Sequence, residues 1–432
     1  MAEALATTRA QRALIAIGVG TALALAGDAT LYAVLPAHAH LVGLQAAQLG
    51  LALSLNRWVR IGSNTPAGFL FDRLSHRHLY LAGLWLGVLP TVGYALARSP
   101  GILLAGRVLW GLCWSLILVG AYAILLETTT SETRGRATGA FQMAYFAGGG
   151  LGTLLGGFLT DLVGFRLALL GCALVNAAGA SIATLFLPET SPAPRRRVEP
   201  GSLGGFLRMG MDEMSALVLG LGHRWADLRR PGVRRRVTLS PLAVGAFVNF
   251  VAYFVVNGVL MSTLAYFLRQ RWGEEVALNG IGVGISTVSG ALLASRSAFS
   301  IILAPLAGRL SDRLGERRRL AAAGLSLEAM GFGVLASALS LRLGGVALGV
   351  ALVAAGGGVL APTLTAWVAD RCEGARQSTA MGVYATAADL GSAAGPLAAY
   401  ALAESVSLTA PYILSAAGVL TALAILLWSH GR

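Results

Sequence analysis

The chain is a succession of long apolar runs separated by short polar segments that contain arginine. About twelve runs reach ~18 residues, the length that a helix needs to cross a hydrocarbon core of ~30 Å. Apolar residues are continuous within each run, which predicts helices rather than the alternating strands of a membrane barrel. The predicted spans are residues 13–35, 44–68, 79–97, 101–126, 136–160, 164–187, 238–268, 277–308, 319–341, 344–369, 378–402 and 408–429. The pattern predicts an all-α membrane protein.

Composition supports a lipid environment. Hydrophobic residues make up 56% of the 432 positions and charged residues only 12%, whereas soluble domains carry roughly 25% charged residues. Such a chain cannot cover its surface with polar groups in water. The lipid bilayer is therefore its expected partner.

The net charge of +13 comes from arginine, since the chain has no lysine. About 24 of the 33 arginines lie at the termini and in every second loop, and about five lie on the opposite side. The positive-inside rule then places both termini and the central loop in the cytoplasm. Because the basic charge is explained by topology, no nucleic-acid partner is expected.

Two sequence motifs occur twice at nearly one offset. The segment Gly68–Arg77 is repeated as Gly308–Arg317, 240 residues later, and Gly139, Gly148 and Gly152 are repeated 243 residues later as Gly382, Gly391 and Gly395. We predict a duplication, with six-helix bundles at 1–187 and 238–432 joined by a cytoplasmic linker at 188–237. Within the linker, residues 203–221 are either a helix at the membrane surface or part of a solvated connection.

These residues resemble the major facilitator superfamily over essentially the whole chain. The loops Gly68–Arg77 and Gly308–Arg317 are similar to its G-x-L-a-D-R-x-G-R-[RK] signature, and Arg107–Gly111 to its fourth-helix R-x-x-q-G pattern. The glycines from Gly139 to Gly157 resemble the antiporter signature of its drug:proton exporters, with Thr153 in place of proline. The resemblance implies two pseudo-symmetric six-helix bundles, the major facilitator fold, that alternate access to a central site.

Ionisable residues at membrane depth are costly and point to function. Four arginines are predicted there, namely Arg57, Arg60, Arg107 and Arg296, with three acids, Asp28, Glu328 and Asp389. The arginines either attract an anionic substrate group or pair internally with the acids and bind nothing.

Proton coupling is predicted for Asp28, Arg107, Glu328 and Asp389. A carboxyl that alternates between a desolvated site and the vicinity of an arginine takes up and releases a proton. Asp28 is the favoured acid, with Tyr32 one turn away, and the role of Arg107 is implied by the resemblance alone.

Polar and aromatic residues at helical spacing are predicted to line the cavity. Asn249, Tyr253 and Asn257 form one stripe on the seventh span. The predicted substrate-binding residues are Tyr32, Asn56, Arg57, Arg60, Asn249, Tyr253, Asn257, Arg296, Trp367 and Tyr384. For any aromatic residue in this set, packing or lipid contact is the alternative.

Two further groups of residues are predicted to control the conformational change. The loop residues Asp72, Arg73, Asp312 and Arg313 form a latch or only anchor the topology. Gly148 and Gly152 form either a sliding seam between the halves or a tightly packed face.

Nothing in the sequence indicates an enzyme, a cofactor or a metal. The chain has no Walker lysine, no metal-ligand spacing and no catalytic constellation. We expect a secondary transporter of the bacterial inner membrane, acting as a monomer, that exports a small amphipathic or organic-anion compound in exchange for protons. The alternatives are uptake or facilitated transport of an anionic metabolite or lysolipid, or a receptor or scaffold without transport.

Overall fold

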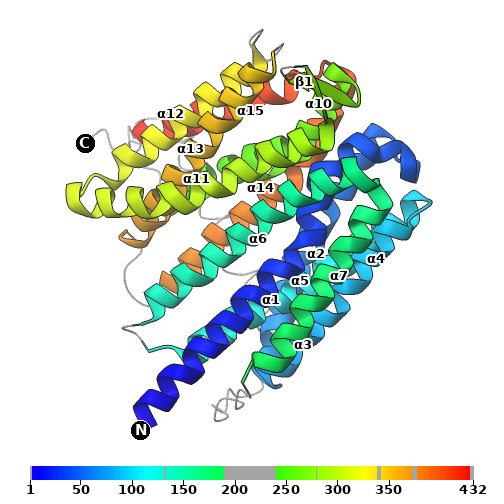
Figure 1. The fold of residues 1–432 in the computed structure, drawn as a ribbon. Helices are drawn as coiled ribbons and strands as arrows, with labels where there is room; N and C mark the ends of the chain where they lie inside the picture. The colour runs from blue at the N-terminus through cyan, green and yellow to red at the C-terminus, as the bar shows by residue number, and fades with distance from the viewer. Residues whose placement is uncertain are drawn as a thin grey trace, which may run out of the picture.

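A computed structural model describes residues 2–130, 133–188, 240–278, 280–337, 342–371 and 377–428. The helix predicted at 203–221, nearly all of the predicted linker and Cys372 lie outside the described residues. We call the described residues up to 188 the N half and those from 240 onward the C half. The helices pack into two bundles, one from each half (Figure 1).

The N half contains six helical spans. They are α1 (Ala2–His38), α2 (Ala46–Phe71), α3 (His76–Leu86) continued by α4 (Val88–Leu96), α5 (Pro100–Thr128), α6 (Arg134–Val163) and α7 (Phe165–Phe186). A short 3-10 turn, η1 (Ala39–Val42), follows α1. Apolar composition and length make most of these helices long enough to cross a membrane.

The described part of the C half also contains six spans. The first is a single rod made of α9 (Pro241–Tyr253), the π-helical segment η2 (Phe254–Leu260) and α10 (Met261–Trp272). The others are α11 (Ile285–Leu314), α12 (Arg317–Ala336), α13 (Leu343–Ala369), α14 (Gln377–Ser405) and α15 (Ala410–Trp428). The prediction of about twelve helices in two bundles is confirmed.

The prediction that the eighth span begins at residue 277 is wrong. Residues there form an antiparallel hairpin of β1 (Glu275–Leu278) and β2 (Ile281–Gly284), with Leu278 opposite Ile281. Gly280, directly before β2, has a φ of 83°, and Asn279 precedes it in the sequence. Asn-Gly is the dipeptide most typical of two-residue hairpin turns. The helix α11 therefore begins only at Ile285.

The two bundles meet at one end and separate at the other. In Figure 1 α6 and α11 lie together near the hairpin and diverge toward the side where both termini lie. We call the side with the termini the terminal end and the opposite side the sealed end. At the sealed end, a Cβ on Gly157 of α6 would collide with the carbonyl oxygen of Ser286 of α11. Glycine there lets the helices of the two halves touch, as expected where lipid gives no hydrophobic drive for association.

Polar contacts also join the halves at the sealed end. The Asp161 carboxylate accepts hydrogen bonds from the Thr287 backbone N–H (2.6 Å) and hydroxyl (2.7 Å) in the first turn of α11. An acidic group at a helix N-terminus is favoured by the helix dipole. The Glu404 carboxylate accepts from the Ala47 N–H at 3.0 Å. These contacts hold the sealed end closed.

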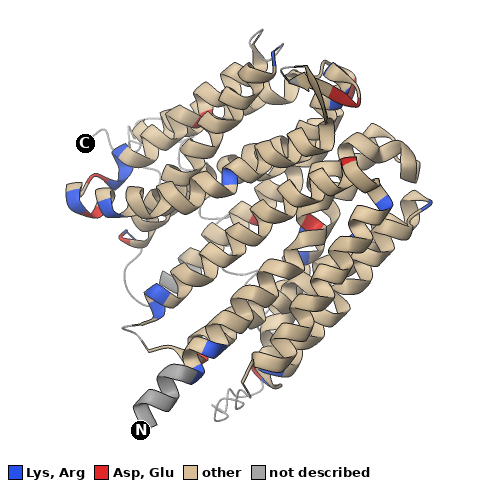
Figure 2. Cartoon of the chain, in the orientation of Figure 1, with Lys and Arg blue, Asp and Glu red and all other residues tan. Residues whose placement is uncertain are grey.

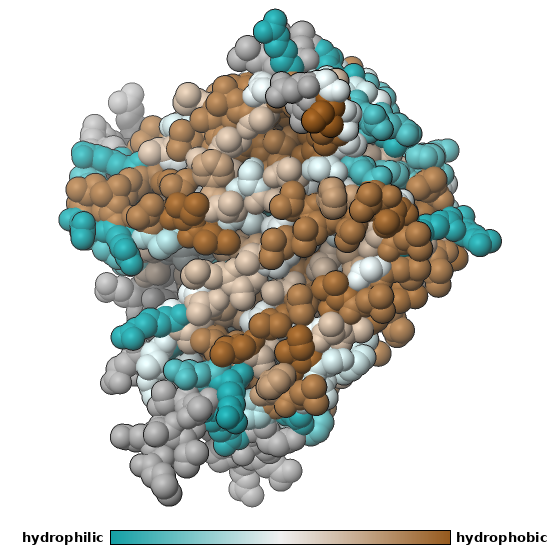
Figure 3. Space-filling model, in the orientation of Figure 1, coloured by the Kyte–Doolittle hydropathy of each residue, from teal (hydrophilic) through white to brown (hydrophobic). Residues whose placement is uncertain are grey.

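The outer surface is apolar, and charge gathers at the helix ends. Figure 3 shows brown side chains over much of the visible helical face, with teal residues mainly at its edges. Leu167, Leu174 and Leu185 of α7 are all more than half exposed. Figure 2 shows few charged residues along the helices themselves. This distribution fits a multi-pass membrane protein.

Candidate functional site: a cavity between the two halves

A cavity of about 680 Å³ lies between the halves. Its walls come from α1, α2, α5 and α6 of the N half and from α9, η2, α10, α11, α12, α13 and α14 of the C half. All hydrogen bonds found between described residues of the two halves lie at mid-membrane or toward the sealed end. The cavity consequently opens toward the terminal end.

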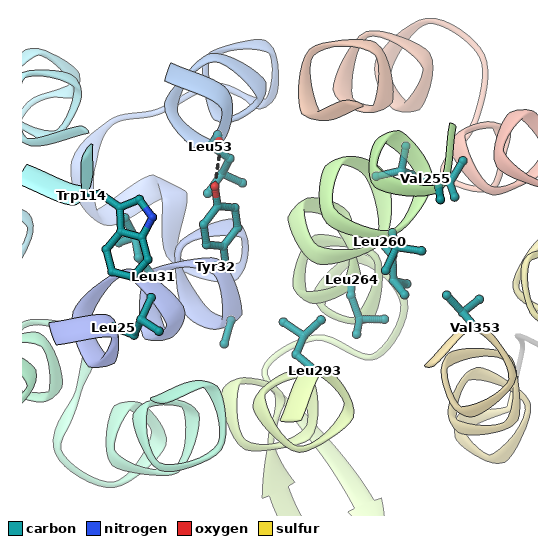
Figure 4. Close-up of a cluster of buried hydrophobic side chains, with 14 of the residues drawn as sticks. Leu25, Leu31, Tyr32, Leu53, Trp114, Val255, Leu260, Leu264, Leu293 and Val353 are labelled. Carbon is teal, nitrogen blue, oxygen red and sulfur yellow. Dashed lines mark hydrogen bonds between the residues drawn. The ribbon is translucent and has the colours of Figure 1, made fainter. Parts of the chain in front are cut away.

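The N-half wall contains a buried ion pair between Asp28 of α1 and Arg107 of α5. Arg107 is fully buried and also donates to the Ala52 carbonyl oxygen (2.7 Å) and the Tyr32 hydroxyl (3.0 Å). The Tyr32 hydroxyl in turn donates to the Leu53 carbonyl oxygen at 2.7 Å, as drawn in Figure 4. Asp28 and Tyr32 line the cavity, whereas Arg107 lies behind them. The pair thus places a carboxylate at the cavity wall with its charge balanced from behind.

Two arginines of α2 reach across to the C half. Arg57 donates to the carbonyl oxygens of Asn257 (2.7 Å) and Ser392 (2.8 Å), and its guanidinium lies over the Tyr32 ring at 5.1 Å. Arg60 forms an ion pair with Asp389 at 3.2 Å. These contacts tie α2 to η2 and α14 at mid-membrane.

The C-half wall contains a third arginine and a third acid. Arg296 of α11 donates to the Asn257 side-chain oxygen at 2.6 Å. Glu328 of α12 lines the cavity and is 1% exposed, and its Oε2 has no hydrogen-bond partner among the described residues. Arg296 and Glu328 both border the cavity but form no direct ion pair in the described part of the chain. The internal pairing weighed from sequence therefore holds for Asp28 and Asp389 and does not extend to Glu328.

The remaining lining is aromatic on one side and mixed on the other. Trp110, Trp114 and Tyr145 of the N half form a continuous contact, with ring centroids 5.5 and 6.0 Å apart. In the C half the predicted stripe of Asn249, Tyr253 and Asn257 does line the cavity. The lining also includes the predicted residues Asn56 and Tyr384.

One predicted lining residue lies elsewhere. Trp367 is buried near the terminal end of α13, where the guanidinium of Arg371 lies over its ring at 4.7 Å. It borders a smaller pocket beside Arg317 instead of the central cavity. The Trp367 ring packs against Gly245 of α9, although Leu364, one turn earlier on α13, does line the cavity.

The glycines predicted as a seam pack inside the N half. A Cβ on Gly148 would meet the backbone of Ala22, and one on Gly152 would meet Ala26 and Ala29, all in α1. Their repeats behave alike, because Gly391 and Gly395 of α14 face α9 and η2 of the C half. Of the two alternatives for these glycines, the contacts correspond to the tightly packed face.

The two signature loops differ from each other in their contacts. Arg317 bridges Asp312 (3.1 Å) and Asp370 (3.0 Å), and Arg313 takes part in no ion pair within the described residues. In the first copy, Arg73 lies over the Phe69 ring at 3.9 Å and Asp72 likewise has no ion pair among the described residues. In this conformation neither Arg73 nor Arg313 forms an ion pair among the described residues, and the latch role stays a prediction.

Several lining residues were missed by sequence reasoning. Tyr145, Phe146 and Gln142 of α6 face the cavity. They lie on the α6 face that the glycine motif leaves open, and Tyr145 is three residues before Gly148. Helical spacing from that motif was the signal that could have identified them. Among the described residues no cluster of His, Cys, Asp and Glu could hold a metal ion.

Comparisons with known proteins agree with this architecture. The family model described as Major Facilitator Superfamily matches residues 17–295 and 257–431. Tetracycline resistance protein, class G, from Vibrio anguillarum is 27% identical over 83% of this chain and 81% of its own length. Cephamycin export protein CmcT from Amycolatopsis lactamdurans is 29% identical, and the match covers 54% of this chain and 49% of that protein.

Solved structures show the same fold. A POT family transporter in complex with 5-aminolevulinic acid superposes with a TM-score of 0.75 at 14% identity, with 96% of both chains covered. A bacterial homolog of the human lysosomal transporter Spinster, described as inward-facing and occupied, gives a TM-score of 0.70 at 16% identity, with the same coverage. These relatives and structures are transporters and not enzymes. The chain belongs to the major facilitator superfamily of membrane transporters.

Proposed function

We propose that this protein exports a small amphipathic compound across the bacterial inner membrane in exchange for protons. The observation that carries the proposal is the Asp28–Arg107 ion pair, whose acidic member lines a cavity between two halves. The Asp28 carboxylate borders the cavity on one side and pairs with the buried Arg107 guanidinium on the other. It is therefore placed to exchange a proton when a substrate enters.

Alternating access is supported by the uneven contact between the halves. They touch at the sealed end and part at the terminal end, so rocking about mid-membrane would move the opening from one side to the other. Arginine is concentrated at the terminal end, which the positive-inside rule assigns to the cytoplasm. We therefore propose that this conformation is inward-facing, with both termini and the linker at 188–237 in the cytoplasm. We also propose that the protein acts as a monomer.

The carboxyl groups differ in how a substrate would reach them. Asp28 borders the cavity, and a cationic or hydrogen-bonding substrate group can compete there with Arg107 for its oxygens. Asp389 is paired with Arg60 and is the second candidate. Loss of either ion pair would free a carboxylate to take up a proton on the outward-facing side.

The direction and the substrate class rest on two further observations. Named relatives include a tetracycline resistance protein and a cephamycin export protein, which supports export. The rings of Trp110, Trp114 and Tyr145 offer stacking surface to an apolar or aromatic group. Arg57, Arg60 and Arg296 also border the cavity and favour the alternative of an anionic metabolite or lysolipid. Their present bonds to Asn257, Ser392 and Asp389 weaken that alternative.

The test uses purified protein in proteoliposomes that contain a pH-sensitive dye. A proton gradient is imposed, and a panel of amphipathic cations and organic anions is added to wild type, Asp28→Asn and Arg57→Ala. We expect substrate-dependent proton flux in wild type and its loss in Asp28→Asn. Substrate movement that ignores the gradient and Asp28, and that is abolished by Arg57→Ala, would instead establish an anion facilitator. Failure of every compound to move or bind would favour a receptor or scaffold.

A further inference from the structure

Glu328 is the acid that the proposed mechanism leaves unused. It lies in the middle of α12 and is almost fully buried, and its Oε2 has no hydrogen-bond partner among the described residues. A buried carboxylate without partners is costly, because desolvation is not offset by hydrogen bonds or a counter-ion. Its position at the cavity wall nevertheless gives protons a route to it.

The chain makes room for this carboxyl in the packing between α12 and α13. A Cβ on Gly356 would lie 2.7 Å from Glu328 Cγ, and one on Gly357 would lie 3.4 Å from Oε1. Neither α13 nor α15, the helices packed most closely on α12, contains an acidic or basic residue within its bounds. The charged side chain that acts on Glu328 is Arg296 of α11, through a long-range electrostatic attraction.

Arg296 is held away from Glu328 by Asn257. Two arginines from different halves donate to this one residue, Arg57 to its backbone oxygen and Arg296 to its side-chain oxygen. Asn257 lies in the π-helical segment η2, where irregular hydrogen bonding frees backbone carbonyls for other donors. Arg57 and Arg296 repel each other at this shared site. The bond from Arg296 to Asn257 therefore competes with the attraction of Arg296 to Glu328. Because Asn257 also accepts the bond from Arg57, this competition affects a contact between the halves.

We propose that Glu328 is a second proton-binding site, whose occupancy decides whether Arg296 stays on Asn257 or turns to Glu328. When Glu328 carries a proton, Arg296 stays on Asn257, η2 keeps its shape and Arg57 remains bound across the interface. When Glu328 releases the proton into the cavity, its carboxylate draws Arg296 away from Asn257. Asn257 then loses the bond that orients it, and the Arg57 contact between the halves weakens.

The direction of this effect matches exchange. Proton binding favours the inward-facing form, with its sealed end closed, and proton release favours opening of that end. This inference rests on the proposed function, since it gives the antiport cycle a second carboxyl. It acts on the C half, whereas the Asp28–Arg107 pair lies wholly within the N half. Arg296 and Asn257 act here as positioning residues.

The test follows the opening of the sealed end in full-length protein in nanodiscs, without substrate. Cys113, Cys172 and Cys372 are replaced by serine, and spin labels are attached to Leu41→Cys and Val406→Cys. These positions are exposed in the N half and the C half at the sealed end. The distance between the two spin labels is measured by double electron–electron resonance at a series of pH values. We expect the wild-type distance to lengthen as pH rises.

The decisive variant is Glu328→Gln, which keeps the size of the side chain and cannot lose a proton. We expect it to hold the short distance at every pH, whereas Glu328→Asp keeps a pH response. Glu316→Gln, a partly exposed acid just before the same helix and outside the central cavity, is the control and should keep the response. The proposal is overturned if Glu328→Gln titrates like wild type, or if Glu316→Gln removes the response as fully as Glu328→Gln does. The monodisperse fraction on gel filtration and the result for Glu328→Asp exclude misfolding as the cause.

The outcome also separates this inference from the proposed function. A normal pH response in Glu328→Gln, with substrate-driven proton flux still lost in Asp28→Asn, would remove the second proton site and leave the exporter. A flat response in Glu328→Gln, with no compound driving proton flux in wild type, would keep the proton site and remove the exporter.

Discussion

The two walls of the central cavity differ in how their buried charged side chains are paired. In the N half, Arg107 satisfies Asp28, the Tyr32 hydroxyl and the Ala52 carbonyl oxygen at once, and aromatic rings pack beside this group. In the C half, Arg296 bonds to a neutral amide oxygen and Glu328 has an oxygen without a partner among the described residues. Two bundles that share two repeated sequence motifs thus differ at the site.

The difference indicates that the two walls have different roles. A fully paired group in a low-dielectric site is rigid, because every partner would lose its bond if one moved. An arginine that is bonded to a neutral residue near an unpaired carboxyl has a second possible partner, which is what a switch requires. We therefore expect damage to the N-half wall to cost stability and damage to the C-half wall to change conformational preference.

The largest expected effect comes from Arg107→Ala. The substitution leaves Asp28 with an uncompensated charge and removes donors from two other oxygens, and breaking a buried ion pair costs about 3–5 kcal/mol. Thermal unfolding in detergent should show a strongly lowered midpoint. The matched control is Arg296→Ala, which removes a bond to one amide oxygen and should cost about half as much or less. An equal loss in both variants would break the contrast between the walls.

The next effect concerns the sealed end, where the two walls touch. Gly157→Ala places a methyl group against the Ser286 carbonyl oxygen of the other half, and overpacking of this kind costs about 1–3 kcal/mol. We expect the closed sealed end to become less populated, with greater access of a thiol reagent to Ser289→Cys, a position that is fully buried between the halves in this conformation. Gly139→Ala on the same helix, with open space around it, should behave like wild type. Unchanged access in Gly157→Ala would mean that the halves tolerate a wider separation than their contacts indicate.

Much of the fold followed from sequence because membrane helices are long and uniformly apolar. The repeat at 240–243 residues corresponds to like packing in the two halves, since Gly391 and Gly395 contact helices of their own half as Gly148 and Gly152 do. The hairpin at 275–284 was missed because its short strands merge with an apolar run, and only Asn279-Gly280 distinguished it. The π-helical segment η2 left no signal, since irregular hydrogen bonding within a helix does not alter hydropathy.

The sequence predicted which residues line the site better than it predicted which of them bond to one another. Spacing along one helix placed Asn249, Tyr253 and Asn257 on one cavity face correctly. It could not show that Arg57 would donate to Asn257 and Ser392 in the other half, because that bond depends on how two bundles are docked. Trp367 was misplaced for a related reason, since its ring packs against Gly245 of α9 and that contact depends on how the helices are docked.

A smaller effect is expected from the aromatic wall. Trp114→Ala removes a ring that lines the cavity beside Trp110 and Tyr145, and one stacking contact with an aromatic substrate would contribute about 0.5–1.5 kcal/mol. For an aromatic substrate this predicts a rise in KM of roughly three- to tenfold, with Trp114→Phe closer to wild type. Tyr384→Phe in the C half removes a hydroxyl bonded to Thr365 and should change KM less. Larger losses in Tyr384→Phe would place the substrate against the C half.

The smallest change in stability is expected where an ion pair joins the two walls. Arg60 and Asp389 are 18% and 28% exposed, and pairs open to water contribute about 0–1 kcal/mol. Asp389→Asn should therefore leave the unfolding midpoint nearly unchanged, and a double-mutant cycle with Arg60→Gln should give a coupling energy below about 1 kcal/mol. The effect of Asp389→Asn on substrate-driven proton flux is the more informative measurement. If Asp389→Asn folds normally and abolishes substrate-driven flux while Asp28→Asn retains it, the coupled proton binds at the joint between the walls. The Asp28–Arg107 pair would then serve only to stabilise the fold. Proton coupling would belong to the interface between the halves and to neither wall alone.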